Sequence, residues 1–216
     1  MAFGCTRVSG ELIDSNDETA FLQWFAPHEI RRLFSPGSVS NRSGTCIFRG
    51  DVFAMAGGSP RHSRLASRII ARLDAALGGG ACDVHTLDLR LGLDAEHFVY
   101  ADVVVACRPL ALRPGAVDVV TNPRVIVEVL SKSTERYDRG PKQAGYLALP
   151  SLEHFVLVSQ REPRVEVYTR EGDGFRFRVH EAGGQVRLER IAVTLAVDEL
   201  YAGVFELPGD ADGSAA

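Results

Sequence analysis

The chain has 216 residues, 45% of them hydrophobic and 24% charged, which is typical of a globular protein large enough to bury its own core. Its formal net charge of −4 excludes the overall basic surface that many nucleic-acid-binding proteins carry, but leaves room for a local basic patch. No apolar run approaches the roughly 20 residues that span a bilayer. The chain begins with no signal-peptide pattern, so we expect a cytoplasmic protein with no membrane segment.

The cysteine pattern gives no sign of a metal site. The four cysteines are Cys5, Cys46, Cys82 and Cys107. None belongs to a Cys-x-x-Cys pair, and none has a histidine at the spacing of a zinc ligand. We therefore expect reduced, buried thiols in a cytoplasmic protein.

Three regions differ in composition. Residues 1–44 follow no regular pattern beyond one short helix expected over 29–34, and we interpret them as a variable N-terminal extension. Residues 45–207 carry the clear periodicities and are expected to form the folded domain. Residues 208–216 are rich in Gly, Asp and Ala, so a disordered tail is predicted there.

The first elements of the domain are a hairpin and a helix. Two apolar runs around a Gly-Asp turn predict a β-hairpin over 46–55. Ser59 as N-cap and Pro60 as first helical residue then predict a helix, whose apolar residues recur up to Leu77. Four arginines lie on one face of this helix: Arg61, Arg64, Arg68 and Arg72. This arginine stripe has two interpretations, contact with phosphates or a solvated helix face.

The remaining pattern alternates between strands and helices. Strands are expected over 84–93, 102–106, 124–130, 154–159 and 164–169, a hairpin over 175–190 around Gly183-Gly184, and helices over 141–149 and 198–204. This order predicts an α/β or α+β domain with one central mixed sheet flanked by helices.

Glu128 is the most informative position. It lies in the β-branched run 124–130, whose odd- and even-numbered residues point to opposite faces of the strand. A carboxylate inside such a strand is costly to bury unless it is paired or binds a metal. The structural alternatives are an ion pair with an arginine such as Arg139, or a place on a solvated face of the sheet.

Asp102 and Lys142 extend this observation. Asp102 precedes the apolar run 103–106, where a lone aspartate is usually a turn or cap residue. On an adjacent strand, however, Asp102 and Glu128 would together offer hard oxygen ligands that suit Mg²⁺. Lys142, in the helix that follows, would add a positive charge, although most lysines are simply solvated. Together the three residues indicate a carboxylate–carboxylate–lysine site.

Several segments resemble the Uma family of bacterial restriction-endonuclease-like proteins, which belong to the PD-(D/E)XK nuclease superfamily. The resemblance is carried by residues 99–105, by residues 122–131 and by residues 132–142, and extends over roughly 45–205. Its most specific part is Glu-Val-Leu-Ser-x-Ser-Thr followed by Asp-Arg-Gly-x-Lys, which spans residues 128–142.

The resemblance implies both a fold and an activity. It implies a restriction-endonuclease-like core, hydrolysis of DNA phosphodiester bonds by a Mg²⁺- or Mn²⁺-activated water, and a homodimer. It further implies that Asp102, Glu128 and the carbonyl of Val129 are metal ligands. Lys142 is then the partner of the attacking water or of the scissile phosphate.

Three more residues are candidate supports of this site. His62 matches the family pattern, with capping or packing as an equal alternative. Asp138 is expected to be the N-cap of the helix that carries Lys142. Cys46 stands where the family usually has a glutamate, and Ala101 replaces the usual proline before the first acid.

The Cys46 departure leaves a second function open. The chain is then a catalytically degenerate nuclease-fold module that binds a partner without cutting DNA. A third alternative is a metal-dependent enzyme that acts on another phosphorylated substrate, because one fold hosts many reactions.

Overall fold

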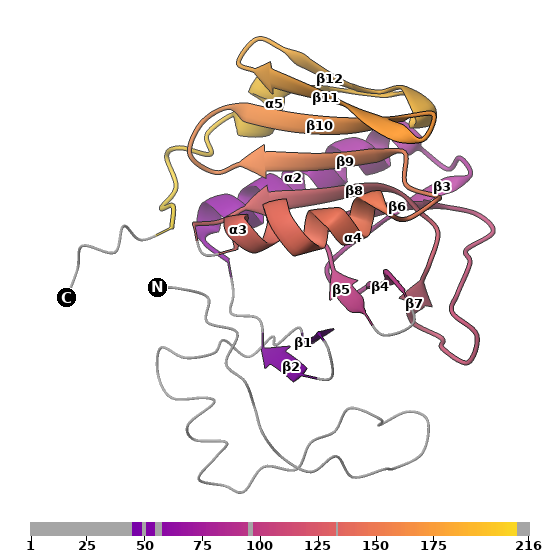
Figure 1. Cartoon of the computed structure of the whole chain (residues 1–216). Coiled ribbons are helices and arrows are strands. Elements are labelled where there is room, and N and C mark those ends of the chain that lie inside the picture. The colour runs from indigo at the N-terminus through magenta and orange to yellow at the C-terminus, as the bar shows by residue number, and fades with distance from the viewer. Residues whose placement is uncertain (1–44, 49–50, 55–57, 95–96, 133, 211–216) are drawn as a thin grey trace, which may run out of the picture. The chain divides into compact units, whose positions relative to one another are not determined.

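A computed structural model of the protein describes residues 45–48, 51–54, 58–94, 97–132 and 134–210 (Figure 1). The chain divides into two compact units between Gly57 and Gly58. In the first unit, β1 (Thr45–Phe48) pairs with β2 (Asp51–Ala54) in an antiparallel arrangement, which confirms the expected hairpin. The helix predicted over 29–34 and the side chain of Cys46 lie outside the described residues.

The second unit is built on a six-stranded sheet. In spatial order its strands are β11 (Gly174–Glu181), β10 (Arg164–Glu171), β9 (His154–Ser159), β8 (Pro123–Leu130), β6 (Val103–Cys107) and β3 (Cys82–His85). β8 and β9 are parallel, whereas the other neighbours are antiparallel. The predicted α+β class with a central mixed sheet is therefore confirmed.

Helices and two small sheets complete this unit. The helical elements are α2 (Pro60–Leu77), α3 (Glu135–Tyr137), the π-helical turn η1 (Asp138–Lys142), α4 (Gln143–Leu147), the 3₁₀ turn η2 (Glu189–Ile191) and α5 (Val197–Tyr201). The small sheets are β5 (Phe98–Tyr100), β4 (Arg90–Gly92) and β7 (Val119–Val120) in that order, and the pair β12 (Gln185–Leu188) and β13 (Val193–Ala196).

The two faces of the central sheet bury separate cores. Val125, Val127 and Val129 of β8 pack with the apolar face of α2 and with β12, β13 and α5. Ile126 and Leu130 pack on the opposite face with residues of α4 and of β4 and β5. Figure 1 shows α2 and α4 on opposite sides of the sheet. The alternation expected for this strand is confirmed, and it places Glu128 on the α4 side.

α2 begins where the sequence predicted. Ser59 Oγ accepts a hydrogen bond from the backbone N–H of His62 at 3.2 Å, and Pro60 takes the first helical position. Leu65, Ile69 and Leu73 face the core and are buried. In the described part of the chain, no helix combines the length and apolarity needed to cross a membrane.

Three members of the arginine stripe make contacts that neither interpretation included. Arg61 donates to the carbonyl of Leu207 at 2.6 Å. Arg68 donates to the carbonyls of Glu199 and Ala202 at the C-terminal end of α5, where cations satisfy carbonyls that have no partner within the helix. Arg72 pairs with Glu199 at 3.1 Å. These side chains join α2 to the C-terminal segment, whereas Arg64 is exposed.

Two predicted strand assignments are wrong. The expected strand over 84–93 is interrupted by a turn that is closed by the Leu89 N–H to Thr86 carbonyl bond, and Leu87 is 42% exposed. The expected hairpin over 175–190 does not form, since β11 pairs with β10 and β12 pairs with β13. The β10–β11 connection is the two-residue turn 172–173, whose glycine has φ 58° and so suits a tight hairpin.

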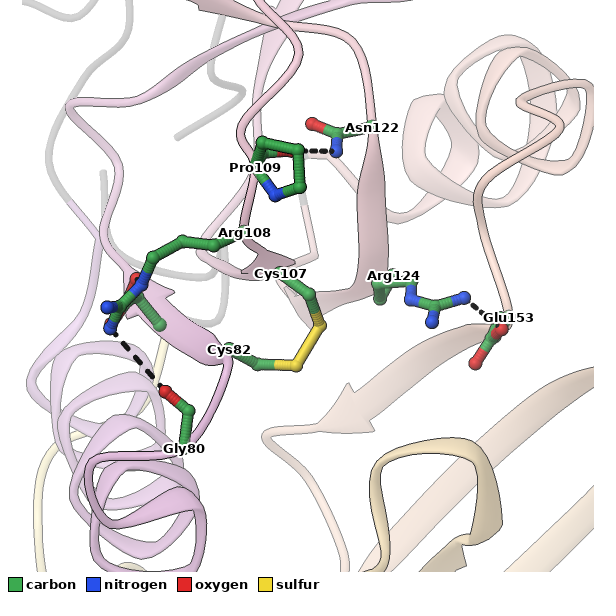
Figure 2. Close-up of a disulfide and its surroundings, with 9 residues drawn as sticks. Gly80, Cys82, Cys107, Arg108, Pro109, Asn122, Arg124 and Glu153 are labelled. Atoms are coloured by element: carbon green, nitrogen blue, oxygen red, sulfur yellow. Dashed lines mark hydrogen bonds and ion pairs between the residues drawn. A yellow bond between two sulfur atoms is a disulfide. The ribbon is translucent and has the colours of Figure 1, made fainter.

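Cys82 and Cys107 lie opposite each other in the β3–β6 pair and form a disulfide (Figure 2). The expectation of reduced thiols is therefore wrong for these two residues. Spacing along the sequence could not reveal the pairing, because it depends on the register of two strands. Beside it, Arg108 binds both carboxylate oxygens of Asp83, at 3.0 and 2.9 Å.

Two residues at the start of the predicted tail make hydrogen bonds with the domain. The carbonyl of Pro208 accepts from the N–H of Arg61 at 3.3 Å. Asp210 Oδ2 accepts from the N–H of Lys132 at 2.8 Å. These contacts hold the start of the predicted tail on the domain, next to the N-terminal end of α2.

Candidate active site

Asp102 and Glu128 come together through the pairing of β6 with β8. Val103 lies opposite Val127, so Asp102, one residue earlier, lies beside Glu128 on the neighbouring strand. Only 7% of Asp102 and 3% of Glu128 is exposed. The N–H of Val129 donates to Asp102 Oδ2 at 2.7 Å. The expectation that the two acids lie on adjacent strands is confirmed, and Asp102 is not a solvated turn residue.

Lys142 reaches the same place from the helical segment after β8. The segment starts at a turn in which Ser131 Oγ accepts from the N–H of Thr134 at 3.1 Å, so the chain folds back over the sheet. Lys142 Nζ lies 2.8 Å from Glu128 Oε1, and the lysine is buried. The alternative of a solvated lysine is therefore wrong. So is the proposed Arg139–Glu128 pair, because Arg139 binds Glu166 at 2.5 and 3.0 Å.

The helical segment agrees with its prediction except for an added turn before it. The backbone leaves helical geometry at Gly140 (φ −111°, ψ −107°), so one helix begins at Pro141, as predicted, and ends at Leu147, while a short helical turn from Glu135 precedes Gly140. Asp138 lies in that preceding turn and is not an N-cap. It is buried, and its Oδ1 lies 3.6 Å from Lys142 Nζ. Asp138 thus acts as a second carboxylate partner of the lysine.

Tyr146 is a site residue that the sequence reasoning missed. Its hydroxyl donates to Glu128 Oε1 at 2.7 Å, and its side chain is fully buried. The signal was present in the spacing, since Lys142 and Tyr146 are four residues apart and so share one helix face. Tyr146 lies within the range of the family resemblance, but the sequence reasoning gave it no role.

His62 lies against the first acid. Its Nε2 is 3.1 Å from Asp102 Oδ2, so its ring contacts the site, in contrast to the alternative of capping or packing alone. Gln160, which sequence reasoning also missed, fixes this helix end. It accepts from Ser59 Oγ at 2.5 Å and donates to the carbonyl of Leu130 at 2.8 Å. The start of α2 is thereby joined to the end of β8.

Burial and charge shift the acid–base properties of the site. Burial raises the pKa of Glu128 to about 8, although the Lys142 ammonium opposes this shift. Burial also disfavours the charged form of Asp102, but His62, Lys142 and the Val129 N–H together outweigh it, and the pKa of that carboxyl is lowered. Burial disfavours the Lys142 cation too, yet Glu128 and Asp138 raise its pKa above the ordinary value. The site therefore holds a protonated Lys142 beside an ionised Asp102 and a Glu128 that is easily protonated.

The donor set fits a hard divalent cation. Both contacts of Asp102 fall on Oδ2 and both contacts of Glu128 fall on Oε1, so within the described residues Oδ1 and Oε2 make no hydrogen bond or ion pair. The Val129 carbonyl faces the same strand edge as its N–H. In the described ranges no group of three or more His, Cys, Asp or Glu side chains could hold a metal ion. The oxygen donors available here are the two carboxylates and this carbonyl.

The mixed sheet, with two acids and a lysine at one strand pair, defines the restriction-endonuclease-like class. Residues 45–199 match the Uma2 family, which is described as “putative restriction endonuclease”. The chain belongs to this family. Its expected membership is thus confirmed.

Relatives of known sequence and structure agree with this assignment. Two uncharacterized proteins of Synechocystis are similar: slr1290, 33% identical over 73% of this chain and 83% of its own length, and sll1609, 32% identical over 59% and 72%. The fold resembles the crystal structure of a protein described as a putative nuclease from Anabaena variabilis. That similarity has a TM-score of 0.62 at 15% identity and covers 74% of this chain and 91% of the other.

Proposed function

We propose that this protein is a Mg²⁺-dependent endonuclease that hydrolyses phosphodiester bonds of DNA. The observation that carries the proposal is the buried Lys142–Glu128 pair, 2.8 Å apart, beside the ionised Asp102. Burying two acids and a lysine is costly, and perturbed groups of this kind are concentrated at functional sites. Family membership supports the reaction class.

The ligands in this proposal are Asp102, Glu128 and the carbonyl of Val129. A bound Mg²⁺ or Mn²⁺ would polarise the phosphate and lower the pKa of a bound water. Asp102 is prepared for this task because the His62 ring and the Val129 N–H hold Oδ2, which leaves Oδ1 for the cation.

Lys142 stabilises developing negative charge. Its raised pKa keeps the ammonium protonated, so it donates hydrogen bonds to a phosphate oxygen or to the attacking water. Glu128 and Asp138 hold the Nζ atom in place, at 2.8 and 3.6 Å. A pre-positioned cation of this kind needs no reorganisation during the reaction.

The test is cleavage of supercoiled plasmid and of single-stranded DNA with Mg²⁺, Mn²⁺ or EDTA. We expect metal-dependent nicking that Asp102→Asn and Glu128→Gln each reduce at least about 100-fold. Glu153→Gln is a matched control, because Glu153 pairs with Arg124 at the opposite end of β8. Equal cleavage by wild type and both site variants would exclude this function.

If the wild-type protein does not cut DNA, the next residue to test is Cys46. If Cys46→Glu then produces metal-dependent nicking, the chain is a degenerate nuclease. If it produces none, the binding-module alternative is favoured. Neither result depends on the position of the Cys46 side chain, which lies outside the described residues.

We also propose a homodimer that acts in the cytoplasm. Two active sites in one assembly allow both strands of a duplex to be cut in a single binding event, and cellular DNA in bacteria lies in the cytoplasm. Sedimentation velocity with and without a short duplex measures the assembly. A monomer that makes only single-strand nicks would contradict the dimer and leave the endonuclease proposal intact.

A further inference from the structure

We propose that Tyr146 is a positioning residue that orients the Glu128 carboxylate for metal binding. The inference rests on the function proposed above and assigns a role to a side chain that the carboxylate–carboxylate–lysine pattern does not include. It is carried by the arrangement of donors around one oxygen atom of Glu128.

Two donors converge on that oxygen. The Tyr146 hydroxyl lies 2.7 Å from Glu128 Oε1, and Lys142 Nζ lies 2.8 Å from the same atom. Both come from one helical segment, so they hold Oε1 toward α4. The carboxylate is planar, so a donor that fixes the position of Oε1 also fixes the direction of Oε2. Asp102 has the same pattern, with its two contacts on Oδ2.

The two donors are not equivalent. The lysine ammonium is a point charge on a flexible stem, which attracts the carboxylate without setting its orientation. The Tyr146 phenol is rigid, and its ring is fully buried with its centroid 5.4 Å from that of Phe155. Its hydroxyl therefore has a fixed place, and we assign the orientation of Glu128 to Tyr146 instead of Lys142.

Local packing holds Tyr146 at this distance from β8. The preceding residue, Gly145, lies so close to Leu93 that an added Cβ would be 2.6 Å from Leu93 Cδ1. A glycine here lets α4 approach the underlying β4 region closely.

Loss of the hydroxyl should therefore affect metal binding more than folding. Groups that orient a metal ligand typically change affinity or activity by 10- to 100-fold when they are removed. Tyr146→Phe removes only the oxygen and keeps the ring on Phe155. Glu128 then keeps its charge partner Lys142 but loses the donor that defines its direction.

Tyr201→Phe is the matched control. Tyr201 is also buried, and its hydroxyl oxygen lies 2.7 and 2.8 Å from the carbonyl oxygens of Ser159 and Arg164, outside the site. Both variants lose one buried hydroxyl, so both lose stability. Only Tyr146→Phe removes a bond to a proposed metal ligand.

The experiment measures Mn²⁺ binding by calorimetry and plasmid nicking as a function of Mg²⁺ concentration, on the full-length chain. We expect the Mn²⁺ Kd of Tyr146→Phe to rise about 10-fold or more, and its half-saturating Mg²⁺ concentration to rise in parallel. At saturating Mg²⁺ the cleavage rate of Tyr146→Phe should fall by a smaller factor than its Mn²⁺ affinity. Tyr201→Phe should bind Mn²⁺ within about 2-fold of wild type.

The outcomes separate this inference from the proposed function. Equal Mn²⁺ affinity in wild type, Tyr146→Phe and Tyr201→Phe overturns the role of Tyr146 and leaves the nuclease intact. Equal weakening by both variants assigns the effect to general destabilisation and also overturns it. A wild-type protein that neither binds Mn²⁺ nor cuts DNA removes the proposed function, and the role of Tyr146 falls with it.

Discussion

Lys142 Nζ and Glu128 Oε1 lie 2.8 Å apart, and both residues are almost completely buried. Each charge would be costly alone in this place, so the two depend on each other. The pKa of Glu128 is nevertheless raised to about 8, chiefly by burial. Glu128 can therefore accept a proton when Lys142 is removed.

The first prediction concerns Lys142→Met. Removing one partner of a buried pair costs about 3–5 kcal/mol when the other stays charged. Glu128 escapes part of this cost by protonation, since its folded-state pKa lies above the unfolded value and the protonated form is favoured at low pH. The loss of unfolding free energy in urea should therefore be larger at pH 9 than at pH 6. In a Lys142→Met/Glu128→Gln double variant this pH difference should disappear, and its persistence would contradict the explanation.

The same pair shows what sequence reasoning could reach. A carboxylate in a β-branched run and a specific motif over 128–142 were enough to bring Asp102, Glu128 and Lys142 into one site. One central mixed sheet also followed from the alternation of elements, although its number of strands did not. The alternation is encoded locally, in period and composition, whereas the role of the motif came from the family resemblance.

The errors arose where tertiary contacts decide. The arginine stripe looked like a surface feature because the carbonyls that accept its hydrogen bonds are more than 130 residues away. The partner of Arg139 proved to be Glu166 of β10, which no local pattern indicates. The Cys82–Cys107 pair depends on strand register in the same way. Strand pairing and helix docking create these contacts, and a single sequence does not encode them in its periodicity.

The second prediction is that Mn²⁺ affinity rises with pH up to about 8. A carboxylate must lose its proton before it binds a cation, and the pKa of Glu128 is about 8. Below that pH the apparent affinity should increase by at most about tenfold per pH unit, and above it the affinity should level off. Calorimetry from pH 6 to 9 in two buffers of different ionisation enthalpy also counts the released protons. A flat profile would show that Glu128 is not the titrating ligand.

The third prediction concerns acid stability and His154. This histidine is fully buried, its Nδ1 lies 3.1 Å from Thr169 Oγ1, and burial lowers its pKa to about 4. The unfolded chain takes up a proton near pH 6.5, so the stability contributed by neutral His154 is complete above that value and is lost as pH falls toward 4. The loss should be about 3 kcal/mol. Chemical denaturation of wild type and His154→Gln over pH 4–7 should give a shallower slope for the variant, and identical slopes would disprove the assignment.

The fourth prediction compares two arginines of the same helix. Arg68 donates to carbonyls at the end of α5, whereas Arg64, one turn earlier, is exposed. Arg68→Gln should lower the unfolding free energy by about 1 kcal/mol, because carbonyls at a helix end lose a charged donor. Arg64→Gln should change it by less than about 0.5 kcal/mol. Equal effects in thermal and urea unfolding would mean that the α2–α5 contact contributes nothing specific.

The fifth prediction concerns the disulfide between Cys82 and Cys107, which are 25 residues apart. Closing a loop of this size lowers the entropy of the unfolded chain and stabilises the fold by about 3 kcal/mol. Cys82→Ser/Cys107→Ser should therefore unfold at a lower urea concentration than oxidised wild type. In the presence of dithiothreitol the two proteins should unfold at the same urea concentration. The nicking rate should be unchanged below the unfolding range, because Asp102 lies beyond the other end of β6. Thiol labelling of the denatured protein tests whether the disulfide forms in solution. Four reactive thiols in the absence of reductant would mean that it does not.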